Sequence, residues 1–380
     1  MTKIYTSVAC NLDANILLAS LPLFEQEKIE AIEWSFDALF KLEQIPPWFA
    51  DLVSEFGKNN RLIGHGVYFS LFSGKWLPEQ QQWLDSLRAF SREFHFDHIS
   101  EHFGFMTGAD FHKGAPISIP YTSSTLALGT DRLMRIQDAA NCPVGLENLA
   151  FAYTLDEVRR QGAFLSELTN KVNGFIILDL HNLYCQIHNF NVPFEKLLHS
   201  YPLEKVREIH ISGGSWEQNH AAPEDKIRRD THDDEVPETV FELLSAAIPK
   251  CPNLKYVVLE QLGTALSDEQ SRSRFQQDFL RMEQIVKNSK TASDGRIVNN
   301  FLPHTSLQSG HVPYEDLQLY REQNELSQIL ETATDLAHAQ KLLASSVLNG
   351  TAWQTETWQP HMLETAIAIA QKWKNGFELK

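Results

Sequence analysis

The amino-acid sequence predicts an α/β fold, a (β/α)8 (TIM) barrel with a C-terminal helical extension. Two observations carry this prediction: short apolar runs recur along the chain, and longer amphipathic stretches separate them. The eight apolar runs span residues 4–9, 31–34, 61–64, 98–102, 144–147, 175–180, 208–211 and 256–260. Strands that alternate with helices pair in parallel through right-handed crossovers. Eight such units, with strands apolar along most of their length, favour a closed barrel over an open sheet.

The amphipathic stretches carry the signals with which helices begin. Pro46-Pro47 opens one stretch and Pro78 another, because proline is favoured in the first helical turn. Thr154 and Glu157 stand at the spacing of a capping box, in which two side chains bind free backbone N–H groups. Two connections are longer than turns, from residue 102 to about 120 and from residue 211 to about 235. Long loops in a compact domain commonly line a site.

Residues 1–290 form the predicted barrel, and residues 291–380 form the extension, which does not repeat the β/α pattern. Two amphipathic helices are predicted in the extension, over about residues 314–348 and 359–375. Their apolar stripes are Leu326, Leu330, Leu336 and Leu343 in the first, and Leu363, Ile367 and Ala370 in the second. We expect these helices to pack on the barrel. A surface for a partner or a second copy is the alternative.

Charge and cysteine content exclude several classes of protein. The chain has 49 acidic and 33 basic residues, a formal net charge of −16. This charge repels phosphate backbones and anionic lipid surfaces, so no nucleic-acid or membrane partner is expected. The four cysteines are widely spaced, which indicates neither a thiolate zinc site nor a disulfide framework. No run approaches the ~20 apolar residues that cross a bilayer, and a cytoplasmic location is expected.

Metal-ligating residue types stand at the ends of six successive predicted strands, the third to the eighth. They are His65, His102, Glu147, Asp179, His210 and Glu260. The loop after the seventh strand adds Asp230 and His232. Each residue alone is more commonly a helix cap, an ion-pair partner or a core histidine, so the joint pattern carries the prediction. The carboxyl ends of barrel strands meet at one mouth, where the active sites of such barrels are built.

Several carboxylates buried together would repel one another and lose their hydration, and divalent ions remove that penalty. More than six nitrogen and oxygen ligands exceed the needs of one ion. Two or three ions that share bridging carboxylates are therefore predicted. A ligand set without thiolates suits Fe, Mn or Zn. A cluster of ions at an open mouth suits catalysis better than a closed structural zinc site does.

Short motifs follow one another at barrel spacing over roughly residues 1–290. They are His65-Gly66-Val67, Ser100-Glu101-His102, Glu147-Asn148, Asp179-x-x-Asn182-Leu-Tyr, Glu208-Ile-His210-Ile-Ser-Gly, Asp230-Thr-His232 and Leu259-Glu260. As an ordered set they resemble the multinuclear non-heme iron-dependent oxidative enzymes, xylose-isomerase-like TIM barrels long catalogued as a domain of unknown function.

The resemblance implies a cofactor of two or three iron ions, with Zn or Mn as the alternatives. The implied ligands are His65, His102, Glu147, Asp179, His210, Asp230, His232 and Glu260. Glu147 and Asp179 are the expected bridging ligands. Asn148, Asn182 and Glu101 are candidates to orient the imidazoles. The two asparagines could instead cap the following helices. The resemblance also implies O2-dependent oxidation of a peptide side chain, often cysteine, commonly with a separate peptide-presenting partner protein.

The chain departs from the family pattern at two positions. Gly214 stands where many relatives have histidine, and His181 stands where many have asparagine. Contacts to substrate, or the occupancy of one metal position, are therefore expected to differ here. His181 or His220 could compensate for the missing histidine. The C-terminal extension lies beyond the usual barrel and could replace the peptide-presenting partner.

Two other functions fit the same residues. One is a metal-dependent hydrolase or isomerase of the endonuclease-IV and xylose-isomerase-like group, whose barrels also collect His, Asp and Glu at strand ends. The net charge weighs against a DNA-repair role, because phosphate binding needs basic residues. The other is a non-catalytic binding protein that keeps the metal site as scaffold. The oxidation of a peptide or a small thiol is the function that the ordered motifs favour.

Overall fold

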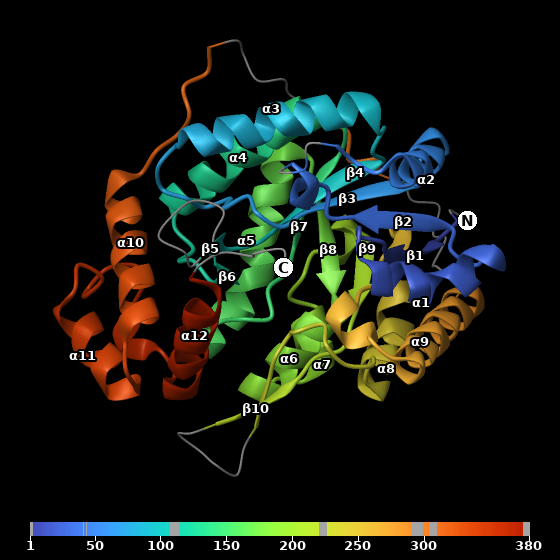
Figure 1. Cartoon of the computed structure of the whole chain (residues 1–380). Helices are drawn as coiled ribbons and strands as arrows, with labels where there is room; N and C mark the ends of the chain where they lie inside the picture. Colours follow the sequence, from blue (N-terminus) through green and yellow to red (C-terminus); the bar gives the residue numbers. More distant parts are fainter. Residues whose placement is uncertain are drawn as a thin grey trace.

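The computed structural model describes residues 3–40, 42, 44–106, 114–219, 226–289, 299–303 and 310–374. Its centre is a closed barrel of eight parallel strands wrapped by helices (Figure 1). In order around the barrel, the strands are β1 (Tyr5–Ala9), β12 (Tyr256–Leu259), β9 (Val206–Ile211), β8 (Phe175–Asp179), β7 (Val144–Glu147), β4 (His98–His102), β3 (Leu62–Gly66) and β2 (Ala31–Trp34). The predicted fold class is confirmed, and each predicted strand ends within two residues of the observed one.

Pairing between the first and last strands closes the barrel, with Tyr5 opposite Tyr256 and Val8 opposite Leu259. Side chains along each strand alternate between the barrel interior and the helix layer. One buried apolar cluster on these strands consists of Ala9, Ala31, Ile63, Tyr256 and Val258.

The barrel helices follow the strands and cover them with apolar faces. They are α1 (Ala14–Glu25), α2 (Pro47–Lys58), α3 (Pro78–Glu93), α4 (Ser123–Ala140), α5 (Leu155–Val172), α6 (Leu180–Phe190), α7 (Phe194–Leu198), α8 (Glu238–Ala247) and α9 (Glu269–Asn288). Pro47 and Pro78 stand in first turns, as predicted. Thr154 caps α5 by accepting from the Glu157 N–H, but the Glu157 carboxylate accepts from the Tyr153 N–H instead of completing the box.

The two long loops each form a short antiparallel hairpin. The loop after β4 contains β5 (Phe105–Met106) and β6 (Pro116–Ile117). The loop after β9 contains β10 (Trp216–Gln218) and β11 (Lys226–Arg228), and β10 projects away from the barrel in Figure 1. The tips of both hairpins, residues 107–113 and 220–225, lie outside the described residues.

In the described part of the C-terminal extension, the α-helices are α10 (Leu317–Thr332), α11 (Leu336–Ser345) and α12 (Pro360–Trp373), which lie together on one side of the barrel (Figure 1). The prediction of one helix over residues 314–348 was wrong. Ala333 adopts an extended backbone that ends α10, and Asp335 caps α11 by accepting from the His338 N–H. The predicted stripe residues are buried, except that Leu336 is partly buried.

Specific contacts join the extension to the barrel. Gln323 on α10 accepts from the Gly74 N–H and donates to the Phe72 carbonyl. The Trp358 ring stacks on Tyr153 with centroids 3.6 Å apart. These contacts agree with helices packed on the barrel, while the predicted division at residue 290 falls in a stretch, 290–298, outside the described residues. Among the described helices, none has the length and apolar character needed to span a bilayer.

Candidate metal centre

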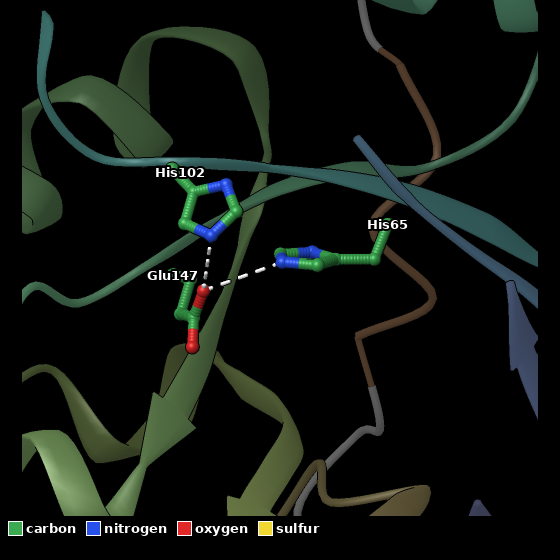
Figure 2. Close-up of side chains that lie close together, drawn as sticks. All are labelled: His65, His102 and Glu147. Carbon is green, nitrogen blue, oxygen red and sulfur yellow. Dashed lines mark ion pairs between the residues drawn. The ribbon is translucent and has the colours of Figure 1, made fainter. Parts of the chain in front are cut away.

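His65 of β3 and His102 of β4 face Glu147 of β7 at the mouth of the barrel (Figure 2). Glu147 Oε2 lies 3.3 Å from His65 Nε2 and 3.5 Å from His102 Nε2. One ligand atom from each residue lies within 4.8 Å of the other two. A single ion with metal–ligand distances of roughly 2 Å could contact all three after small adjustments. We call these three residues the outer group.

Both imidazoles of the outer group are oriented through their Nδ1 atoms. The Ser100 hydroxyl donates to the Gly64 carbonyl, so its oxygen accepts from His65 Nδ1 at 2.8 Å. His102 Nδ1 donates to the Gly66 carbonyl at 3.1 Å. Each ring therefore has Nε2 as its free nitrogen, and Nε2 is the atom that faces Glu147. Such hydrogen bonds fix the tautomer of a metal-binding histidine.

A second set, the inner group, consists of Glu147, Asp179, His210 and Glu260, all buried. His210 Nδ1 lies 3.1 Å from Glu260 Oε2 and 3.6 Å from Glu147 Oε1. Glu147 thus presents one oxygen to each group, the arrangement expected of a bridging carboxylate. Asp179, the other predicted bridging ligand, belongs to the inner group alone.

Asp179 ends β8 and caps α6. Its Oδ1 accepts from the Asn182 N–H at 2.5 Å, which leaves Oδ2 buried and without a hydrogen-bond partner. Asn148 accepts from the Asp179 N–H at 2.7 Å and donates to its carbonyl, and Asn182 donates to the Asn148 carbonyl. The two predicted asparagines therefore hold the backbone and side chain of Asp179 and do not contact an imidazole through these bonds.

Asp230 and His232 lie beside the inner group, in the loop after β11. His232 Nε2 lies 3.0 Å from Asp230 Oδ1, and His232 Nδ1 lies 3.9 Å from Glu260 Oε2. His181 Nδ1 also contacts Asp230 Oδ1, at 2.9 Å, and Arg228 Nε donates to His181 Nε2. His232 has a φ of +52°, in the left-handed region that non-glycine residues adopt uncommonly.

Gly214 and His181, the two positions that depart from the family pattern, lie close together. A Cβ atom at Gly214 would lie 2.2 Å from the Arg229 carbonyl oxygen and 2.8 Å from His181 Cε1, so no side chain fits there without a shift. His181 occupies that space and binds Asp230. His220 lies outside the described residues.

Two carboxylates that were not predicted as ligands are Glu33 of β2 and Glu208 of β9. They form a third group of potential ligands with His210. Both carboxylates are buried inside the barrel. Two features of the sequence could have indicated these residues. Glu208 alternates with His210, and Glu33 is a lone carboxylate inside the apolar run of β2. The predicted ligands came from the ends of strands three to eight, whereas Glu33 lies on the second strand and Glu208 lies before the end of the seventh.

Glu101 does not orient an imidazole, and its predicted role was wrong. It follows Ser100 on β4, and the alternation of the strand turns it away from the barrel interior, towards Gly66. Both carboxylate oxygens are buried without a hydrogen-bond partner. Burial, followed by the charge of Asp37, raises the pKa of Glu101 well above its ordinary value.

Burial and mutual charge perturb the pKa values throughout the centre. Burial raises the pKa of Glu33 to about 7 despite the opposing effect of His210. Burial and the charge of His65 lower the pKa of His102 to about 4. Burial alone would lower the pKa of His65, but the hydrogen bond and charge of Glu147 and the charge of Glu33 raise it to about 9. Such opposed shifts cluster at functional sites.

Several buried polar atoms in the centre have no hydrogen bond of good geometry. They are Asp179 Oδ2, Glu33 Oε2, Glu208 Oε1 and both ring nitrogens of His210. Buried polar atoms are rarely left in this state. The donors are imidazole nitrogens and carboxylate oxygens, which suit Fe, Mn and Zn. The residues present therefore fit a metal cofactor, and the protein is a (β/α)8 barrel of the metal-binding class.

A match to a family profile identifies the family of this chain. The sequence profile of the family described as "RiPP precursor modification enzyme MbnB/TglH/ChrH" matches residues 43–264, more than half of the chain. The chain belongs to this family, and the resemblance seen in the sequence is confirmed. All eight predicted ligand positions, from His65 to Glu260, lie inside the matched segment.

Relatives with curated sequences are similar at a lower level. A UPF0276 protein of Shewanella oneidensis is 24% identical over 212 residues, 54% of this chain and 73% of that protein. One of Caulobacter vibrioides is 25% identical over 184 residues, 48% of this chain and 62% of that protein. Among solved structures, endonuclease IV from Thermus thermophilus has a TM-score of 0.48 at 10% identity, covering 74% of this chain and 99% of that one.

Proposed function

We propose that this chain uses O2 and two or three iron ions to oxidise a side chain, such as cysteine, of a ribosomally made peptide or a small thiol. The observation that supports it most is Glu147, which presents one oxygen to each of two ligand groups at the barrel mouth. The family description supports a peptide precursor as the substrate.

The proposed ligands are the eight residues predicted from the sequence. They are His65, His102, Glu147, Asp179, His210, Asp230, His232 and Glu260. Iron ions held by these residues would supply redox chemistry between O2 and the substrate. The chain's own residues hold the ligands in place: Ser100 fixes His65, the Gly66 carbonyl fixes His102, and Asn148 and Asn182 hold Asp179.

The hairpin β5–β6 and the C-terminal helices lie next to the mouth and are proposed to shape its rim. Phe105 of β5 packs edge-to-face on Trp353, with centroids 5.6 Å apart. Through this contact the extension supports the loop that directly follows His102. A separate peptide-presenting protein and this extension are the two proposed ways in which a peptide is delivered.

The test begins with anaerobic purification, metal analysis and Mössbauer spectroscopy. We expect a multinuclear iron centre, O2 consumption with reductant, and an oxidative mass change in a short cysteine-containing peptide encoded beside the gene. The peptide is added with and without any neighbouring candidate partner protein. Glu147→Ala should abolish the mass change, and Glu101→Gln should not.

Two results would contradict the proposal. A protein that holds only zinc and consumes no O2 when iron is supplied would exclude the oxidative chemistry. Cleavage of abasic-site DNA or isomerisation of an aldose with added Mn or Zn would favour the hydrolase or isomerase function instead.

A further inference from the structure

His210 is a fully buried imidazole with carboxylates near both ring nitrogens. Nδ1 faces the inner group, 3.1 Å from Glu260 Oε2. Nε2 points to the barrel interior, where it lies 3.1 Å from Glu33 Oε2 and 3.4 Å from Glu208 Oε1. The imidazole and both interior carboxylates are buried. A side chain placed in this way can bind an ion through one nitrogen while the other nitrogen donates a proton.

A chain of hydrogen bonds extends from Glu208 towards the amino-terminal end of the barrel. Arg207 is the extra residue of a β-bulge between β8 and β9, and its Nε donates to His98 Nδ1 at 3.1 Å. Asp97 holds the Arg207 guanidinium at 2.9 Å and the Lys255 ammonium at 2.6 Å.

The chain of hydrogen bonds determines which of its atoms donate a proton and which accept one. His98 Nδ1 lies 3.3 Å from Asp97 Oδ2 and 3.1 Å from Arg207 Nε. The contact with Arg207 is the shorter one, and a guanidinium has only donors, so we take His98 Nδ1 as the acceptor and Nε2 as the nitrogen that carries the proton. His98 Nε2 then donates to Glu208 Oε2 at 2.8 Å. Glu208 keeps Oε1 as its free acceptor, and Oε1 is the oxygen that faces His210 Nε2. Because an acceptor faces His210 Nε2, these hydrogen-bond directions favour the form of His210 that carries its proton on Nε2.

We propose that Glu208, held by His98 and assisted by Glu33, positions His210 so that Nδ1 is its metal-binding atom. The inference rests on the proposed function only in requiring that a metal ion occupies the inner group. A carboxylate that accepts from a ligand imidazole fixes the ring and makes it a stronger donor, and loss of such a partner commonly weakens metal affinity about 10–100-fold. Glu33, Glu208 and His98 are positioning residues and do not contact a substrate.

The experiment compares Glu208→Gln with two matched variants. Glu101→Gln removes another fully buried carboxyl, on β4, that has no hydrogen bond to the centre. Ser100→Ala removes the partner of His65 in the outer group. The full chain is loaded with Zn²⁺ and titrated with a chelator. We expect Glu208→Gln to weaken one bound ion about 10–100-fold and leave another unchanged. Ser100→Ala should weaken a different ion, and Glu101→Gln none.

Cobalt loading supplies a readout that a purely structural role would not alter. With Co²⁺ at saturation, we expect the visible absorption bands of Glu208→Gln to shift, because the donor strength of His210 changes. The bands of Glu101→Gln should match those of the wild type. If Glu208→Gln fails to fold, Glu33→Gln on β2 is used instead, because it replaces the other carboxylate that faces His210 Nε2.

The outcomes separate the two proposals. If the wild type binds no metal ion, the proposed function and this inference both fail. If the wild type binds metal and Glu208→Gln retains its affinities and cobalt spectrum, only this inference fails. An anomalous-scattering peak between Glu33 and Glu208 would also overturn it, since His210 Nε2 would then bind an ion instead of carrying a proton.

Discussion

Glu147 is the carboxylate that the outer and inner groups share, through Oε2 and Oε1 respectively. Replacing it with alanine removes a ligand from both groups at once, so we expect Glu147→Ala to lose more than one ion per chain. His65→Ala should lose mainly the ion of the outer group, and Asp179→Ala mainly that of the inner group. Metal analysis after desalting measures each stoichiometry. Equal losses in all three variants would contradict a bridging role for Glu147.

Glu157 is a partly buried carboxyl outside the centre that gives stability a pH dependence. Burial raises its pKa to about 7, although hydrogen bonds from the Tyr153 backbone and Ser118 oppose the shift. In the unfolded chain a glutamate titrates near 4.3. Between these values the folded state holds a proton that the unfolded state has released, so the contribution of Glu157 to stability falls as pH rises through this range.

Glu157→Gln removes this titration and keeps an acceptor for the Tyr153 N–H. We therefore expect the variant to gain stability relative to the wild type as pH rises from 5 to 8, measured by urea unfolding at each pH. Glu25→Gln, at an exposed position on α1, is the control for replacing a glutamate with glutamine. A constant difference for Glu157→Gln would contradict the shifted pKa.

One contact between the C-terminal helices and the barrel is the stack of Trp358 on Tyr153. Trp358 is 6% exposed, and its Nε1 also donates to the Trp353 carbonyl. Trp358→Ala should cost about 3–5 kcal/mol of unfolding free energy, because it leaves a cavity and removes a buried ring. Trp48→Ala, at a tryptophan 52% exposed on α2, should change it by less than about 0.5 kcal/mol. Denaturant unfolding measures both values, and equal effects would contradict the packing.

The sequence predicted the barrel strands well because each is buried on both faces and therefore apolar along its length. It predicted the extension less well, since the periodicity of α10 continues across Ala333 into α11. The break depends on the backbone at Ala333 and the cap at Asp335, which apolar spacing does not reveal. The short hairpins were not predicted either, because strands of two or three residues show no clear alternation.

At the scale of the whole molecule, the predicted ligands do meet at one mouth, since parallel strands end together. The interior carboxylates Glu33 and Glu208 were not predicted. Their role depends on the pairing of β2 and β9 with their neighbours, and on which residues then face one another across the barrel. Sequence position gives the end of a strand but not the depth at which two side chains meet.

Removal of metal should destabilise the whole molecule, because an ion that binds only the folded state stabilises it by mass action. At a free metal concentration about a thousand times the Kd, that gain is about 4 kcal/mol per ion. We expect excess chelator to lower the Tm of the metal-loaded wild type. The Tm of Glu147→Ala should change much less on the same treatment. An unchanged wild-type Tm would indicate that the centre holds no ion.

Closure of the barrel by β1 and β12 also has a consequence during synthesis. The proposed ligands extend from His65 to Glu260, and β12, which precedes Glu260, must pair with β1 before the mouth exists. A ribosome-bound chain that lacks the final strand therefore has no complete centre, and we expect metal to enter only after most of the protein has emerged. Arrested chains ending at residue 250 should retain no ion in metal analysis, whereas chains in which residue 289 has emerged should.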